Sequence, residues 1–159
     1  MTEMATTIRR AQLADLDQLA VLWKELADLY AAVDAKYALA SNAQALWREG
    51  AFHRLEDDNQ RVLLAETDGV AVGFIVGVVR EAPNVFLARY HGHITDIFVT
   101  GELRRRGIGR KLYQALAEWF RERDVAMIDL NVAAASPAAQ AFWRNVGFTD
   151  WMLRLATDL

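Results

Sequence analysis

The feature that most constrains the fold of this 159-residue chain is a tight turn between two strand-like runs. Residues 61–66 and 70–80 are rich in β-branched side chains, which favour extended strands. The Asp68-Gly69 pair between them can adopt the positive φ angles that a short hairpin turn requires. The sequence therefore predicts a β-hairpin in the middle of the chain.

Further strands and helices are expected on both sides of this hairpin. Apolar residues at three- and four-residue spacing predict amphipathic helices, and alternating or continuous β-branched runs predict strands. The additional strands are expected at 6–10, 91–99, 125–132 and 148–156, and the helices begin at a cap formed by Asp15, at a Ser41/Gln44 capping box, at Gly107, and at Ser136 before Pro137. This order predicts an α/β fold in which helices cover both faces of a mixed sheet.

Composition limits the classes of protein that need to be considered. Hydrophobic residues make up 53% of the chain and charged residues 25%, which is typical of one globular domain, here 1–159. The absence of cysteine excludes disulfides, thiolate metal sites and a cysteine nucleophile. Met1–Arg10 lacks the apolar stretch of a secretory signal, and the longest apolar run, Val70–Val79, is too short to span a bilayer. We therefore expect a cytoplasmic protein without a membrane partner.

A basic, glycine-containing turn follows the strand expected at 91–99 and opens the next helix. Backbone N–H groups at a helix start lack helical partners, and together with nearby arginines they predict an anion site. Its expected members are Arg104, Arg105, Arg106, Gly107, Ile108, Gly109 and Arg110. The turn lacks the Gly-Lys-Ser/Thr of a nucleotide P-loop, and Leu112 replaces the third glycine of a dinucleotide fingerprint. Charge alone would equally allow a solvated face or a nucleic-acid contact, but the glycine spacing and the preceding strand favour a bound cofactor.

Two motifs together resemble the GNAT superfamily of N-acetyltransferases. The family's Arg/Gln-x-x-Gly-x-Gly/Ala signature is matched by residues 104–109, after a strand that ends in Val99. Its second signature, Asn-x-x-Ala-x-x-Phe-Tyr-x-x-x-Gly-Phe, is matched by residues 136–148. The resemblance covers nearly the whole chain.

The resemblance implies a mostly antiparallel sheet that splays between two central strands, with acetyl-CoA as the co-substrate in the split and no metal. The pantetheine arm would then pair with the backbone of Ile97, Phe98 and Val99, and the amide of Ile97 would polarise the thioester carbonyl. The pyrophosphate would lie on residues 104–110. Ser136, which stands where the family has asparagine, would cap its helix and donate to the cofactor.

The implied reaction moves an acetyl group to a primary amine of a small molecule or peptide by direct attack on the thioester. A lysine-like amine, with a pKa of about 10.4, is neutral in only about one molecule in a thousand at pH 7.4, so a base is expected. Several family members carry a proton acceptor, Glu or His, at the position that matches His93, which is our first candidate. Simple alternation places His93 on one face with Ile97, and Ile94 with Asp96 on the other. Asp96 is the second candidate, because a β-bulge could turn it inward.

Three further points remain open at the level of sequence. Trp143 replaces the tyrosine that commonly protonates the departing thiolate, so solvent, Tyr90 or Tyr113 could serve, or no acid is needed. A non-catalytic acyl-CoA-binding regulatory module is therefore the alternative function.

Residues 30–45 and 80–89 are expected to select the substrate, and the acidic and aromatic side chains that could recognise a cationic amine are Asp28, Tyr30, Asp34 and Tyr37. The resemblance allows a homodimer, and the net charge of −3 argues against nucleic acid as a partner.

Overall fold

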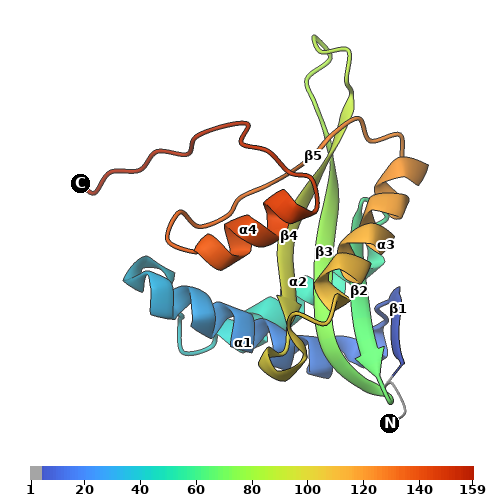
Figure 1. Ribbon diagram of the computed structural model, residues 1–159, viewed down its shortest axis with the longest axis vertical. Coiled ribbons are helices and arrows are strands. Elements are labelled where there is room, and N and C mark those ends of the chain that lie inside the picture. The colour runs from blue at the N-terminus through green and yellow to red at the C-terminus, as the bar shows by residue number, and fades with distance from the viewer. Residues whose placement is uncertain (1–4) are drawn as a thin grey trace.

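The computed structural model describes residues 5–159, so the first four residues of the expected domain lie outside it. Its centre is a five-stranded sheet of order β1-β2-β3-β4-β5, shown in Figure 1. The pairings β1–β2, β2–β3 and β3–β4 are antiparallel, and β5 runs parallel to β4. The strands are β1 (Thr6–Arg10), β2 (Gln60–Thr67), β3 (Val70–Glu81), β4 (Tyr90–Val99) and β5 (Ile128–Leu130).

Helices cover both faces of this sheet. Helices α3 (Ile108–Glu122) and α4 (Pro137–Asn145) pack on one face, and α1 (Leu16–Val33) and α2 (Ala43–Glu56) pack on the other. Alternate residues along β2 supply the two cores: Leu63 packs with α3, and Leu64 packs with α1. The mixed α/β fold class is thus confirmed. No helix in residues 5–159 is both long and apolar enough to cross a membrane.

The predicted hairpin is confirmed. Asp68 and Gly69 have φ angles of 51° and 79°, and the turn joins β2 to β3. The predicted helix over 107–123 is also observed within one residue at each end. Leu112, Leu116 and Phe120 on its inner face are at most 1% exposed, as the apolar spacing predicts.

Two predicted helix caps differ in detail from those observed. Asp15 is the N-cap residue of α1, as predicted, but its carboxylate makes no capping bond to that helix and instead accepts the backbone N–H of Gln12 before the 3-10 turn Leu13–Asp15. The second helix begins at Ala43 rather than Ser41, and Asn42 occupies its N-cap position. The first difference arises because a short polar side chain can bond to any nearby backbone or charged group, so a capping pattern does not fix which bond is made. At the second helix, the Asn42 side chain makes no capping bond either.

Two predicted strands are shorter than expected or not formed. Residues 125–132 contain only the three-residue strand β5, and 148–156 form no strand. Phe148 packs against the α3 core, but the side chains that follow it are exposed, with Trp151 at 63% and Leu153 at 89%. A strand needs a hydrogen-bonding neighbour, and within residues 5–159 the segment has none, so its apolar pattern indicates only a capacity to pair.

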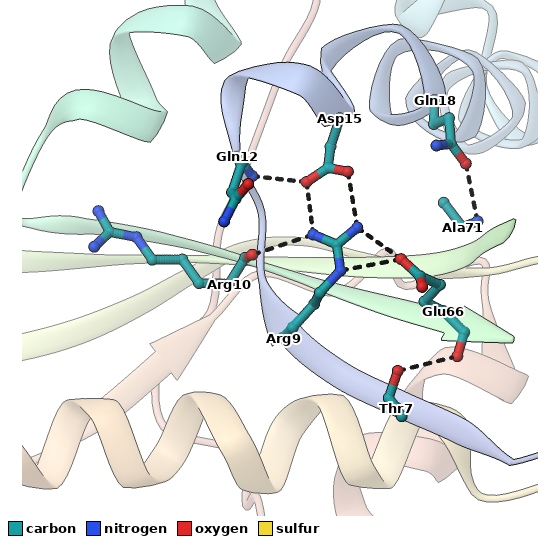
Figure 2. A network of polar contacts seen from close by, with 8 residues as sticks. All are labelled: Thr7, Arg9, Arg10, Gln12, Asp15, Gln18, Glu66 and Ala71. Carbon is teal, nitrogen blue, oxygen red and sulfur yellow. Dashed lines mark hydrogen bonds and ion pairs between the residues drawn. The ribbon is translucent and has the colours of Figure 1, made fainter. Parts of the chain in front are cut away.

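A charge network fixes the connection from β1 to α1, as Figure 2 shows. The Arg9 guanidinium donates to both carboxylate oxygens of Asp15, at 2.7 and 2.9 Å, and to Glu66 of β2 at 2.6 Å. The same Asp15 carboxylate accepts the backbone N–H of Gln12 at 2.7 Å. These bonds, first of all the one from Arg9, hold the pKa of Asp15 below its ordinary value.

We expect Asp15→Asn to lower the free energy of unfolding by about 2 kcal/mol at pH 7, because a largely buried charge-assisted network loses its anion. Urea unfolding monitored by circular dichroism measures the change. The matched control is Asp17→Asn, whose ion pair with Arg48 is exposed and contributes at most about 1 kcal/mol. A carboxyl group with a lowered native pKa stabilises the fold above its ordinary pKa and ceases to do so as the pH falls through the native value. The difference between wild type and Asp15→Asn should therefore shrink as the pH falls below the ordinary carboxyl pKa, and an equal loss at pH 7 and in acid would contradict this account.

Candidate active site

A bulge in β4 decides which of its side chains face which helices. Ile94 pairs with Gly77 and Asp96 pairs with Val76, so Thr95 is an extra residue without a partner on β3. As a result, Ile94 and Ile97 both pack against the α3 core, although side chains three positions apart would face opposite sides of a regular strand. The predicted face assignment is therefore wrong: His93 lies with Asp96 on the α1/α2 face, and not with the side chain of Ile97. The β-bulge that was expected to allow Asp96 to turn inward is present at Thr95.

The β4 and β5 strands separate after a short paired stretch. Their pairing covers only Gly92–Ile94 opposite Ile128–Leu130. Successive N–H groups of a strand point to opposite edges. Since Thr100 N–H donates to the carbonyl of Val72 in β3, the N–H groups of Ile97 and Val99 point to the other edge, beyond the end of β5. The split leaves two backbone donors of β4 without a strand partner in the described part of the chain.

The start of α3 lies directly beyond this split. Arg105 and Gly107 both have positive φ angles, 61° and 80°, and Gly107 is the N-cap residue. The first N–H that bonds back to this turn is that of Lys111, which donates to Gly107, so the N–H groups of Ile108, Gly109 and Arg110 lack helical partners. Such a nest of amides, at the positive end of a helix dipole, favours an anion.

The arginines around this turn divide into two pairs. The Arg104 Nε donates to the Val99 carbonyl at 2.9 Å, and its guanidinium lies 5.3 Å from the centre of the Phe98 ring. Arg110 donates to the carbonyl of Asn145 at the end of α4. Arg105 and Arg106 are exposed, and neither side chain has a hydrogen-bond or ion-pair partner within residues 5–159. The first pair therefore holds the turn in place, and the second pair is available to a ligand.

A histidine and an aspartate meet on the α1/α2 face beside the split. Asp129 of β5 is directly opposite His93, and its carboxylate Oδ1 is hydrogen-bonded to Nδ1 of the imidazole. His93 is 8% exposed, and Nε2 of His91 lies 3.9 Å from the other oxygen of Asp129. Sequence reasoning missed Asp129. Its signal was an acidic residue between two apolar ones in the segment 125–132, which was predicted as a strand.

Asp96 lies nearby, on the far side of the bulge from His93. Its side chain is 17% exposed and lies 3.9 Å from the guanidinium of Arg54 on α2. Burial raises the pKa of Asp96, and the Thr95 hydroxyl, Arg54 and His93 partly offset that increase. The pKa of Tyr30 on α1 is also raised, first by burial and then by the negative charge of Asp96. The two helices thus bring an aromatic hydroxyl and a cation next to the second predicted base.

Of the four side chains predicted to recognise an amine, two lie together. Tyr30 and Tyr37 have ring centres 5.7 Å apart. Asp28 is paired with Lys24, and Asp34 accepts the backbone N–H of Lys36, so both carboxylates already have local partners.

Helix α4 packs with α3, on the opposite face of the sheet from His93 and Asp129. Ser136 precedes Pro137 at its start, as predicted, but the Ser136 hydroxyl makes no capping bond and is available to a ligand. Trp143 is 6% exposed and packs against Tyr113, Phe142 and Phe148 with ring centres 4.9–5.9 Å apart. The Trp143 indole is therefore part of the core, and its ring is not presented to the split.

The residues present fit a long anionic ligand with an acyl end. The amide nest with Arg105 and Arg106 suits phosphates, and the free amides of Ile97 and Val99 suit an extended amide-containing arm. The polar cluster of His93, Asp96 and Asp129 would then border the far end of that ligand. No group of three His, Cys, Asp or Glu side chains among the described residues could hold a metal ion.

Comparison with known proteins agrees with this arrangement. An uncharacterized N-acetyltransferase of Archaeoglobus fulgidus is 33% identical over 91 residues, which cover 57% of this chain and 61% of that protein. The [ribosomal protein bS18]-alanine N-acetyltransferase of Escherichia coli strain K12 is 28% identical over 76% of each chain. The chain thus spans about three fifths of the length of its archaeal relative.

The fold also matches that of solved structures. The aminoglycoside N-acetyltransferase AAC(6')-Iy in complex with CoA superposes with a TM-score of 0.78 at 19% identity, over 99% of this chain and 96% of that one. A sequence model described as the acetyltransferase (GNAT) family matches residues 22–148. On this match, which covers most of the chain, the protein belongs to the GNAT acetyltransferase family.

Proposed function

We propose that this chain transfers an acetyl group from acetyl-CoA to a primary amine of a small molecule or peptide. The observation that carries the proposal is the split between β4 and β5, whose free backbone donors lie next to the amide nest of α3. One long ligand with phosphates at one end and a thioester at the other would satisfy both. The named relatives act on amines of both kinds, a protein alanine in one case and an aminoglycoside in the other.

The chemistry follows from the groups that border the split. The amine nitrogen attacks the thioester carbonyl carbon, a C–N bond forms, and the C–S bond breaks. The N–H of Ile97 would stabilise the negative charge that develops on the carbonyl oxygen, because it lies in the plane of the sheet at the open edge. It can therefore act although the side chain of Ile97 packs on the opposite face from His93.

The proton of the attacking amine goes to His93 in this proposal. His93 borders the split on the α1/α2 face, and its Nε2 has no hydrogen-bond partner within residues 5–159. Asp96 suits this role less well, because Arg54 and the Thr95 hydroxyl already bind its carboxylate. The Asp96 carboxylate, whose negative charge acts on the nearby Tyr30 of α1, would instead attract the cationic form of the substrate.

The departing CoA leaves as a thiolate and takes its proton from water. A thiol has a pKa of about 8.5, so its anion is a tolerable leaving group near neutral pH. Trp143 is in the core, and the Tyr113 ring packs against it, so the indole is not available at the split. Tyr90 begins β4, about 20 Å from Ile97 at the rise of an extended strand.

We expect Gly109→Val to weaken acetyl-CoA binding by about tenfold or more. A Cβ atom at this position would lie 3.2 Å from the Phe142 ring, and the rest of the valine would crowd the start of α3 where the phosphates are proposed to bind. Isothermal titration calorimetry gives the dissociation constant, and the melting temperature reports on the fold. Gly101→Val is the control, since no atom lies within 4 Å of a Cβ there. Unchanged affinity in Gly109→Val would overturn the placement of the cofactor.

We expect His93→Gln to lower kcat by about a hundredfold at pH 7 while the dissociation constant of acetyl-CoA changes by less than about twofold. Glutamine fills a similar volume and can donate and accept hydrogen bonds, but it cannot take the proton. Free-thiol release is measured with a peptide bearing an N-terminal alanine and with an aminoglycoside, and His53→Gln, on the exposed face of α2, is the control. Tight CoA binding without thiol release by the wild-type protein across a broad amine panel would instead favour the non-catalytic regulatory module.

A further inference from the structure

We propose that Asp129 is a positioning residue that holds His93 in the protonation form needed to accept a proton, an inference that rests on the proposed function. The β4–β5 pairing places the two residues directly opposite each other, on the face away from α3. The short parallel ladder has only three residue pairs, and this is its central pair. The strand pairing that ends at the split therefore also sets the distance between the imidazole and the carboxylate.

The hydrogen bond decides which ring nitrogen carries the proton. A carboxylate can only accept, so when His93 is neutral its Nδ1 must be protonated and its Nε2 carries the lone pair. Nε2 has no hydrogen-bond partner within residues 5–159 and is not fully buried, so it is accessible to solvent. Asp129 thereby turns a largely buried histidine into a base with a free, solvent-accessible ring nitrogen.

The step that Asp129 supports is a single proton transfer. The proton leaves the attacking amine nitrogen and binds Nε2 of His93, while the Nδ1 proton remains hydrogen-bonded to Asp129. The imidazolium that forms is then balanced by the carboxylate, and it returns its proton to water after the product leaves. Because Asp129 acts through His93 and touches neither amine nor thioester, its effect is on orientation and charge.

Other charged or titratable groups lie around the His93–Asp129 pair. On β4 they are His91, at 3.9 Å from the second oxygen of Asp129, and Asp96 beyond the bulge. From α2 the site receives Arg54, and from α1 the phenol of Tyr30. On β3 the residue opposite His93 is the apolar Val78. Asp129 is the one carboxylate hydrogen-bonded to the His93 ring within residues 5–159.

The chain contains three histidines, which makes a direct test practicable. In a long-range proton–nitrogen spectrum of the labelled protein without substrate, His93 should be the Nδ1–H tautomer at a pH where it is neutral. His53→Gln and His91→Gln assign the signals. In Asp129→Asn, which matches the shape but can donate to Nδ1, the His93 signal should move toward the Nε2–H tautomer. Asp129→Glu, which retains the carboxylate, should keep the Nδ1–H form, and an unchanged His93 signal in Asp129→Asn would overturn the proposal.

The kinetic arm separates this inference from the proposed function. Asp129→Asn should lower kcat by about tenfold or more and leave the KM for acetyl-CoA within about twofold, because it removes the orientation of the base and leaves cofactor binding intact. Asp150→Asn, an exposed ion-pair partner of Arg144, is the control. If His93→Gln reduces kcat and Asp129→Asn does not, the role of Asp129 is overturned. If neither does, the failure lies with His93 as the base.

Discussion

The extra residue in β4 is the constraint on which the arrangement of the site depends. In a regular strand, Asp96 would follow Ile94 onto the α3 face, and its carboxylate would have to be buried among apolar side chains at a cost of several kcal/mol. The bulge at Thr95 lets Ile94, Ile97 and Val99 pack against α3 while His93 and Asp96 both face α1 and α2. One unpaired residue thus places the apolar side chains of β4 on the α3 face and its polar side chains on the α1/α2 face.

The short length of β5 is the second constraint on the site, and its effect depends on the bulge in β4. A strand paired along the whole of β4 would use the N–H groups of Ile97 and Val99, and no backbone donors would remain at that edge. Because the pairing stops after three residues, it holds Asp129 against His93 and then leaves the following stretch of β4 open. The loop after β5 is fixed by Gln140 of α4, whose side-chain amide donates to the carbonyls of Ala133 and Ala134.

Charge of opposite sign lies at the two ends of this open stretch. Arg105, Arg106 and the amide nest of α3 are at one end, and Asp96 and Asp129 are at the other. A polyanionic ligand and a cationic amine would therefore be drawn to adjacent but different places. Arg104 contributes differently, since its bond to the Val99 carbonyl stabilises the end of the strand.

The sequence by itself determined the features that local physics controls. The Asp68-Gly69 turn, the apolar face of α3 and the glycines at its start follow from backbone angles and helical periodicity, and they were predicted close to where they lie. Tertiary structure alone decided the bulge at Thr95, the meeting of His93 with Asp129, the burial of Trp143 and the absence of a strand at 148–156. Each of these depends on hydrogen bonds or packing between segments far apart in the chain, and no local pattern of residues specifies which partner is present.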